Sequence, residues 1–277
     1  MTAQQIVKRV QSNLGMPWKA SKLDGFAAGS PDTTVTGIAT TFTPTVEVLR
    51  RAASGGKNFI ISREPVFYLD PRYTGGPAPV REEFDSNATV RFKRDFIAEH
   101  GLVVWRFFEN WNARKTDGQL RALAAALNWE KYYKPKPGQE PYQQGNEFFV
   151  VPQTSLEAMA KMVRQRLTAN GLRVIGDPKT QVSTVALTHG FLLVPELETV
   201  LKEPGLDAVI CGEPVEWEAG PYFIDLVASG EKKGMIVVGH EASEEPGSGE
   251  MAAWLKTFIT EIPVEWIPAG DPFRVLT

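Results

Sequence analysis

The chain of 277 residues is 43% hydrophobic and 23% charged, which is typical of a folded globular protein, and its length favours two domains or one large α/β unit. The net charge of −3 argues against a nucleic-acid partner, because such proteins need a basic face. No apolar run approaches the ~20 residues that span a bilayer, so no membrane partner is expected.

The cysteine content and the start of the chain bear on the compartment. Cys211 is the single cysteine, which excludes an intrachain disulfide and a cysteine-cluster zinc site and fits a reducing environment. The first residues show no export signal, although a signal removed beforehand would leave no trace. A cytoplasmic protein is expected.

The first half of the chain alternates short β-branched runs with helical patterns. Residues 37–42 and 58–62 are predicted strands, and residues 45–54 between them form a helix that ends at Gly55 and Gly56. This βαβ unit predicts a right-handed crossover and a mostly parallel sheet. The alternation continues with a helix at 91–100, a strand at 102–107 and a helix capped by Asp117.

The second half repeats this organisation after a break. Residues 132–145 are proline-rich, polar and unpatterned, and form the predicted linker. A capping box of Thr154 and Glu157 starts the next helix. Strands are predicted at 147–151, 172–175, 184–187, 208–211 and 235–238. We therefore expect an α/β protein of two lobes with mixed, mostly parallel sheets flanked by helices. The lobes are residues 1–135 and 136–277, with the 239–250 segment returning to the cleft between them.

Polar side chains follow several of the predicted strands, at the edge where open α/β sheets bind ligands. They are Arg63, Glu64, Glu109, Asn112, His189, Glu213, His240 and Glu244. The pair His240 and Glu244 is the most specific, because an imidazole nitrogen and a carboxylate oxygen suit zinc, iron or manganese. The alternative is a local hydrogen bond for His240 and a helix N-terminal role for Glu244. The common nucleotide-binding and hydrolase motifs are absent.

Five ordered fragments point to a family: V-T-G-I-A-T-T-F-T-P-T-V-E-V-L-R-R-A, F-I-I-S-R-E-P-V-F-Y, I-C-G-E-P, V-V-G-H-E-A-S-E and D-P-F. Over about residues 4–273 they resemble the Nif-three-like dinuclear metal-centre family, also labelled GTP cyclohydrolase I type two. The resemblance implies a two-lobed α/β fold, a toroidal homohexamer and two divalent metals in a cleft of each subunit. The histidine and glutamate ligands of its G-H-x-x-S-E element match His240 and Glu244.

The other ligand positions that the resemblance implies are changed in this chain. Arg63 and Glu64 stand where the family has tandem histidines after a strand. Phe108 and Asn112 stand where it has a further histidine and an aspartate. Arginine and phenylalanine offer no lone pair to a metal, and Asn112 offers only a neutral carbonyl oxygen.

Three states of the site remain open. In the first, no metal binds, and Arg63 replaces it electrostatically by pairing with a carboxylate of Glu64, Glu109 or Glu244. In the second, one divalent cation of the zinc, manganese or iron class binds. In the third, two cations bind. The candidate ligands are Glu64, Asn112, His240 and Glu244. The residues favour the metal-free or weakly metallated state, then one cation. A dinuclear centre is disfavoured, because Arg63 at 4 Å would repel a second divalent ion by ~8 kcal/mol at an effective dielectric of 20.

Two functions are compatible with these residues. The first is a hexameric protein that binds an unidentified small molecule, with catalysis reduced or lost and with Arg63, Phe108 and Glu109 lining the pocket. The second is a cyclohydrolase-like metal-dependent hydrolase of a nucleotide or related heterocycle, in which one cation activates water. The groups that would move the proton are Glu64, His189 and Glu213. A plain loop hydrogen bond for His189 and a ligand-orienting role for Glu213 are the alternatives.

Overall fold

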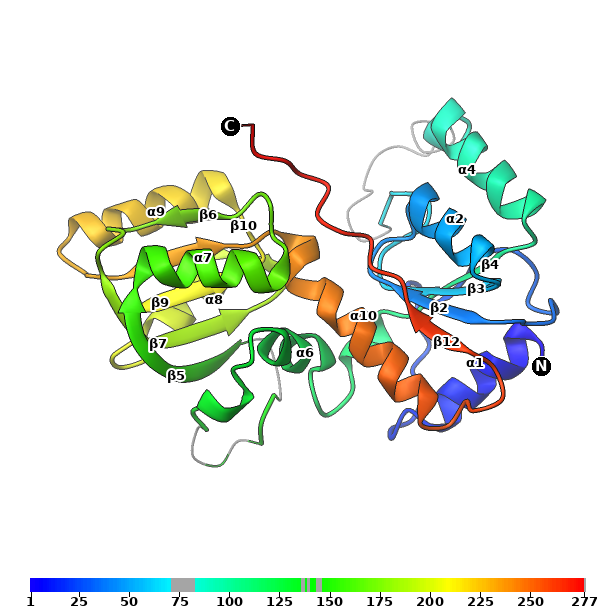
Figure 1. Cartoon of the computed structure of the whole chain (residues 1–277), viewed down its shortest axis with the longest axis horizontal. Coiled ribbons are helices and arrows are strands. Elements are labelled where there is room, and N and C mark those ends of the chain that lie inside the picture. Colours follow the sequence, from blue (N-terminus) through cyan, green and yellow to red (C-terminus); the bar gives the residue numbers. More distant parts are fainter. Residues whose placement is uncertain (71–82, 136–137, 139, 143–145, 277) are drawn as a thin grey trace. The chain divides into compact units, whose positions relative to one another are not determined.

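The computed structural model describes residues 1–70, 83–135, 138, 140–142 and 146–276. The chain forms two compact units. The first unit comprises Met1–Arg114 and Ser248–Ala269, and the second comprises Lys115–Gly247 and Gly270–Thr277. In each unit, helices cover a mixed sheet (Figure 1), which confirms the predicted α/β class.

The first unit contains a five-stranded sheet in the order β1-β4-β3-β2-β12. Its strands are β1 (Gly25–Ala28), β2 (Ile38–Thr41), β3 (Phe59–Ser62), β4 (Val103–Arg106) and β12 (Val264–Trp266). All neighbours pair in parallel except the edge strand β1, which is antiparallel to β4. The predicted βαβ unit is β2, α2 (Val46–Ser54) and β3, and Gly55 ends its helix as expected. The carboxyl ends of β3 and β4 thus lie at one edge of the sheet.

Helices cover both faces of this first sheet. Side chains of α2 and α4 (Ala88–Glu99) pack on one face, around Ala39, Ile60 and Val104. On the other face, α1 (Ala3–Ser12) and the end of α10 (His240–Lys256) pack around Phe59 and Trp105. The inner strands β2, β3 and β4 are buried on both sides, which explains why their sequences are continuous apolar runs.

The second unit contains a five-stranded sheet in the order β5-β7-β9-β11-β6. Its strands are β5 (Asn146–Ser155), β6 (Arg173–Ile175), β7 (Gln181–Thr188), β9 (Ala208–Cys211) and β11 (Gly234–Val237). The three central strands are parallel, and the edge strands β5 and β6 are antiparallel. A small parallel ladder joins β8 (Phe191–Leu192) and β10 (Glu213–Pro214).

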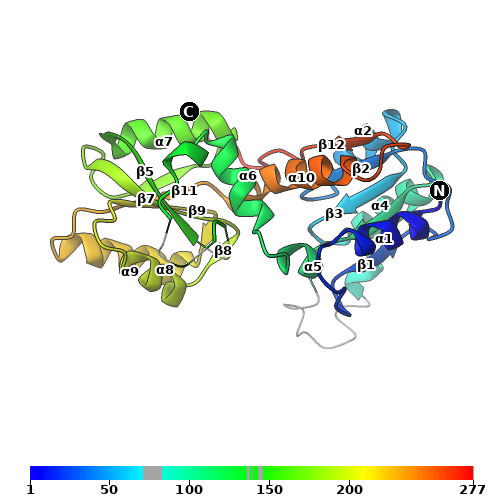
Figure 2. The same ribbon diagram turned by 90° about the horizontal axis from the view of Figure 1, so that it is seen from below.

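Helices also cover both faces of the second sheet (Figure 2). Those on one face are α6 (Gly118–Ala126) and α7 (Leu156–Leu167), and those on the other are α8 (Val194–Leu201) and α9 (Glu216–Ala228). Two short helices are α5 (Glu109–Asn112) in the first unit and the 3-10 helix η1 (Glu130–Tyr132) in the second. In the described part of the chain, no helix has both the length and the apolar character that a bilayer crossing requires.

Three details differ from the sequence-based expectation. The units divide at Arg114 and Lys115 instead of near residue 135, because α6 buries Leu120 and Leu123 against the second sheet. The predicted linker 132–145 therefore belongs to the second unit, and residues 136, 137, 139 and 143–145 of it lie outside the described residues. The helix α7 is capped by Ser155 instead of Thr154, because the Ser155 hydroxyl accepts the backbone N–H of Ala158 at 3.2 Å.

Candidate metal centre

Three site residues of the second unit lie where parallel strands end. His189 follows β7, Glu213 opens β10 just after β9, and His240 begins α10 after β11. Because β7, β9 and β11 run parallel as neighbours, their carboxyl ends meet at one edge of the sheet. The strand order thus brings together residues that are up to 51 positions apart in sequence, from His189 to His240.

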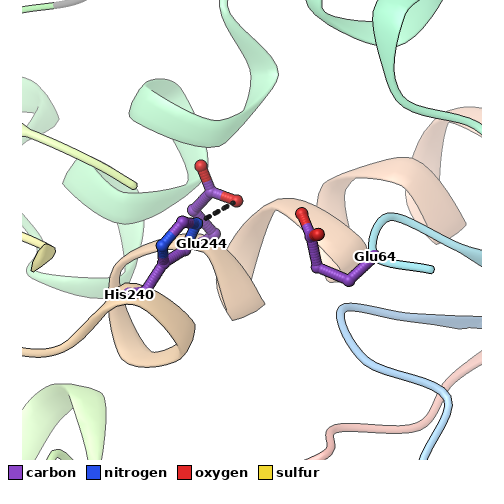
Figure 3. Close-up of side chains that lie close together, drawn as sticks. All are labelled: Glu64, His240 and Glu244. Carbon is purple, nitrogen blue, oxygen red and sulfur yellow. Dashed lines mark ion pairs between the residues drawn. The ribbon is translucent and has the colours of Figure 1, made fainter. Parts of the chain in front are cut away.

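His240 and Glu244 form the core of this group (Figure 3). They lie four residues apart on the first turn of α10, so both side chains project from one side of the helix. The His240 Nε2 atom is 3.6 Å from Glu244 Oε2. On the opposite side of the ring, His240 Nδ1 is 3.0 Å from Glu213 Oε2, and this contact holds the pKa of Glu213 below its usual value. The carboxylate thus orients the ring and leaves Nε2 facing Glu244.

His189 lies between two carboxylates. Its Nδ1 is 2.8 Å from Glu244 Oε1 and its Nε2 is 3.0 Å from Asp117 Oδ2. Burial alone would lower the pKa of His189, but the two acids outweigh it and raise this pKa to about 9. Both ring nitrogens therefore donate, as only the imidazolium can. Glu244 is almost fully buried, with 3% of its surface exposed.

Gly190 lies beside Glu244 and His240 and leaves space open there, because it has no side chain. A Cβ at this position would lie 2.5 Å from Glu244 Oε1 and 3.6 Å from His240 Nε2. The backbone at Gly190 also has a φ of +63°, which L side chains rarely adopt. The Gly190 N–H donates to Ser243 Oγ, which in turn donates to the His240 carbonyl, so the loop is fixed to the start of α10. A side chain at Gly190 would press on the Glu244 carboxylate and fill the space next to His240 Nε2.

The geometry of His240 and Glu244 fits a divalent ion. Zinc lies ~2.1 Å from an imidazole nitrogen or a carboxylate oxygen, so two atoms that share one ion are at most ~4.2 Å apart. The observed 3.6 Å between Nε2 and Oε2 is inside that limit and longer than a hydrogen bond. The carboxylate of Glu213 on the other ring nitrogen is the arrangement that metal-bound histidines commonly have.

In the first unit, the residues at the ligand positions that the resemblance implies interact with one another. Arg63 is 97% buried, and its guanidinium Nη1 donates to Asn112 Oδ1 at 2.7 Å. The same guanidinium lies 4.6 Å from the centre of the Phe108 ring. Arg63 and Asn112 thus satisfy each other at two positions where the resemblance implies metal ligands.

A second buried arginine supports this cluster. Arg106, the last residue of β4, donates from Nε to the Arg63 carbonyl at 2.9 Å. Its Nη2 is 2.6 Å from Asp70 Oδ2 and 3.5 Å from Glu64 Oε2. Arg106 also lies 5.0 Å from the Phe108 ring centre, so two guanidiniums contact one aromatic ring. Glu64, which Figure 3 also labels, is thereby held beside a fixed positive charge in its own unit.

Phe108 and its neighbours are positioned by Asp24. The carboxylate of Asp24 accepts backbone N–H groups of Phe108, Glu109 and Asn110 at 2.6 to 2.9 Å, at the start of α5. The side chain of Glu109 accepts a hydrogen bond from the Ser21 hydroxyl. This contact holds Glu109, one of the predicted carboxylate partners of Arg63, at the exposed surface of α5.

The predicted site residues therefore fall into two groups, each described within its unit. The second unit brings together His189, Glu213, His240 and Glu244. The first brings together Arg63, Phe108 and Asn112, with Glu64 at Arg106. The sequence pattern indicates only a capping role for Asp117, and it places Arg106 at the end of a predicted strand without a specific role. Asp117 does cap α6, but the contact of its second oxygen with His189 has no local signal in the sequence.

The comparisons with known proteins identify the family. No curated protein matched the sequence. Among solved structures, Staphylococcus aureus hypothetical protein SA1388 is 19% identical, covers 100% of this chain and 99% of its own, and has a TM-score of 0.71. A Bacillus cereus protein related to NIF3 is 14% identical, with the same coverages and TM-score. Reduced HcgD from Methanocaldococcus jannaschii is 16% identical, with coverages of 96% and 97% and a TM-score of 0.59.

These likenesses show a shared fold, and a family model extends them to the sequence. The model for Duf34/NIF3 (NGG1p interacting factor 3) matches residues 1–271. That range includes both groups of site residues and nearly all of the two units. The chain therefore belongs to the Duf34/NIF3 family.

Proposed function

We propose that this protein binds one divalent cation at His240 and Glu244 and uses the site to hold a small molecule. The observation that carries the proposal is the separation of 3.6 Å between His240 Nε2 and Glu244 Oε2, with Glu213 orienting the ring. Zinc, manganese and iron suit such a nitrogen and oxygen donor pair. Water would complete the coordination.

The charges around the pair support a single cation. The group contains three carboxylates, those of Asp117, Glu213 and Glu244, and one imidazolium, that of His189. His240 must be neutral to bind a metal. The group then carries a formal charge of −2, which one divalent ion would neutralise. Because of this negative charge, we favour the state with one bound cation over the metal-free state, which the sequence alone favours.

The first unit supports the absence of a second metal. The side-chain oxygen of Asn112 accepts from Arg63, so it would have to lose this bond before it could ligate a cation. Arg63 itself has no lone pair to offer and carries a fixed charge. A degenerate site with one cation, in place of the family's dinuclear centre, is the state we propose. The homohexamer expected from the resemblance is part of the same proposal.

A metal-dependent hydrolase is the second candidate function. The observation that favours it is Glu213, whose side chain is 52% exposed although it contacts His240. A bound cation would supply Lewis-acid activation of water. A half-exposed carboxylate beside a ligand histidine can hold a proton and release it to solvent. Hydrolysis of a nucleotide or related heterocycle would distinguish this function from binding alone.

Metal analysis tests the proposal. Protein purified without chelator should contain one equivalent of a divalent metal per chain by inductively coupled plasma mass spectrometry, and the variant His240→Ala should contain almost none. His100→Ala is the matched control and should retain the metal, because the hydrogen bond of the His100 ring within the described residues goes to its own helix carbonyl at Phe96. A wild-type protein that takes up no metal at micromolar concentration would overturn the proposal.

A further inference from the structure

The carboxylate of Glu244 is fixed by a chain of hydrogen bonds on the side away from His240. Its role as a metal ligand does not require these contacts. A free glutamate side chain samples several rotamers, and fixing it costs up to ~2 kcal/mol of conformational entropy. Here Oε1 is fixed by His189 at 2.8 Å, which leaves Oε2 as the oxygen nearest to His240 Nε2. The two oxygens of one carboxylate thus face different partners.

His189 is itself fixed by Asp117 on the opposite ring nitrogen, at 3.0 Å. The second oxygen of Asp117, Oδ1, accepts the backbone N–H groups of Gln119 and Leu120, both at 3.0 Å. These residues open α6, which buries Leu120 in the core of the second unit. The contacts therefore run from a core helix through Asp117 and His189 to Glu244.

Each member of this chain has little room to move. His189 has 14% of its side chain exposed and Asp117 has 16%, while Glu244 has 3%. The Gln119 side chain also reaches the Glu244 carbonyl, at 3.4 Å. A rigid ring between two carboxylates transmits position well, because an imidazole has no internal rotation between its two nitrogens.

We propose that Asp117 and His189 are positioning residues that hold Glu244 in the orientation in which Oε2 and His240 Nε2 bind one cation together. This inference rests on the proposed function and adds two residues that do not touch the ion. Residues that orient a metal ligand commonly change metal affinity 10–100-fold when they are replaced. A loss of that size is expected when the chain of contacts is broken.

Two substitutions at Asp117 separate positioning from helix capping and from charge. Asp117→Ser retains a good N-cap for α6 but is too short to reach His189. Asp117→Asn also retains the cap, and its amide donates to His189 Nε2, so His189 Nδ1–H still donates to Glu244. We expect Asp117→Ser to lower the affinity for Zn²⁺ and Co²⁺ 10–100-fold and Asp117→Asn to stay within about 3-fold of wild type.

The measurements are metal affinity by competition with a chromogenic chelator, the visible spectrum of the Co²⁺-loaded protein, and circular dichroism to show that each variant is folded. Asp117→Ser should alter the Co²⁺ spectrum, which a loss of helix stability alone would not do. The matched control is Asp207→Ser, since Asp207 also accepts two backbone N–H groups, at 2.8 Å each, away from the histidines. This variant should bind metal as the wild type does.

The outcomes distinguish this inference from the proposed function. If the wild type binds metal and Asp117→Ser binds it equally well, the positioning role is refuted and the metal site stands. If Asp117→Asn loses as much metal affinity as Asp117→Ser, the negative charge of Asp117 supports metal binding and its positioning of His189 does not. In that case the inference also fails. A wild type that binds no metal overturns both proposals.

Discussion

Placing a histidine and an aspartate in the first unit, at two positions where the resemblance implies metal ligands, should allow a second metal to bind. The double variant Arg63→His/Asn112→Asp removes the buried guanidinium and supplies an imidazole and a carboxylate at positions that now contact each other at 2.7 Å. In the wild type, an ion on the Asn112 oxygen would lie within ~5 Å of the Arg63 charge. At an effective dielectric of 20, this repulsion is about 7 kcal/mol for a divalent ion, or a factor of roughly 10⁵ in affinity.

The assay is the number of metal equivalents per chain after equilibration with Zn²⁺ or Mn²⁺ and removal of free ion. The metal content of the double variant should rise from one equivalent per chain towards two. Asn112→Asp alone should stay at one, because Arg63 would pair with the new carboxylate. Arg9→His, which alters a surface ion pair with Glu261, is the control for the Arg-to-His change. A folded double variant that still binds one equivalent or less would refute the reasoning about Arg63.

Three further predictions concern the same fold. Gly190→Ala should lower metal affinity at least 10-fold and reduce stability by ~1–3 kcal/mol in urea unfolding, whereas Gly205→Ala, with a similar φ of +72° and open space, should lose only stability. With chelator present, His189→Gln should be less stable than wild type below about pH 6.5, and the difference should vanish as the pH passes 9, because the folded pKa is raised to about 9; a constant difference would contradict this. Burial lowers the pKa of Lys93 from 10.5 to about 8, and its Nζ has no hydrogen-bond partner in the part of the chain that the structure describes. Lys93→Met should therefore increase the free energy of unfolding at pH 7 by about 3 kcal/mol, from 1.36 kcal/mol per pKa unit. This gain should shrink between pH 8 and 10.5. No gain at pH 7 would show that the folded protein accommodates the Lys93 charge.

Much of the fold follows from local patterns in the sequence. The parallel strands β2, β3, β4, β9 and β11 are buried on both faces, so each is a short apolar run that periodicity and flanking glycines reveal. The edge strand β12 is not predicted, because its three residues include the exposed Glu265 and Trp266. The predicted unit boundary falls too late in the chain, because the proline-rich segment is a local signal whereas the packing of α6 is not.

The candidate site also has a part that local sequence patterns indicate and a part that they do not. His240 and Glu244 lie on one helical turn, so their spacing alone suggests a shared role. The contact between Asp117 and His189 joins residues 72 positions apart and depends on how α6 and β7 pack. The bond between Arg63 and Asn112 spans 49 positions. The sequence indicates that both residues belong to the site, but no local pattern indicates that they bond to each other.

The most direct test of a single cation is a crystal structure of metal-loaded protein with anomalous diffraction at the metal edge. A single-cation site predicts one anomalous peak per chain, ~2.1 Å from both His240 Nε2 and Glu244 Oε2, and no peak beside the Arg63–Asn112 pair. Two peaks per chain, or a single peak away from His240, would contradict it.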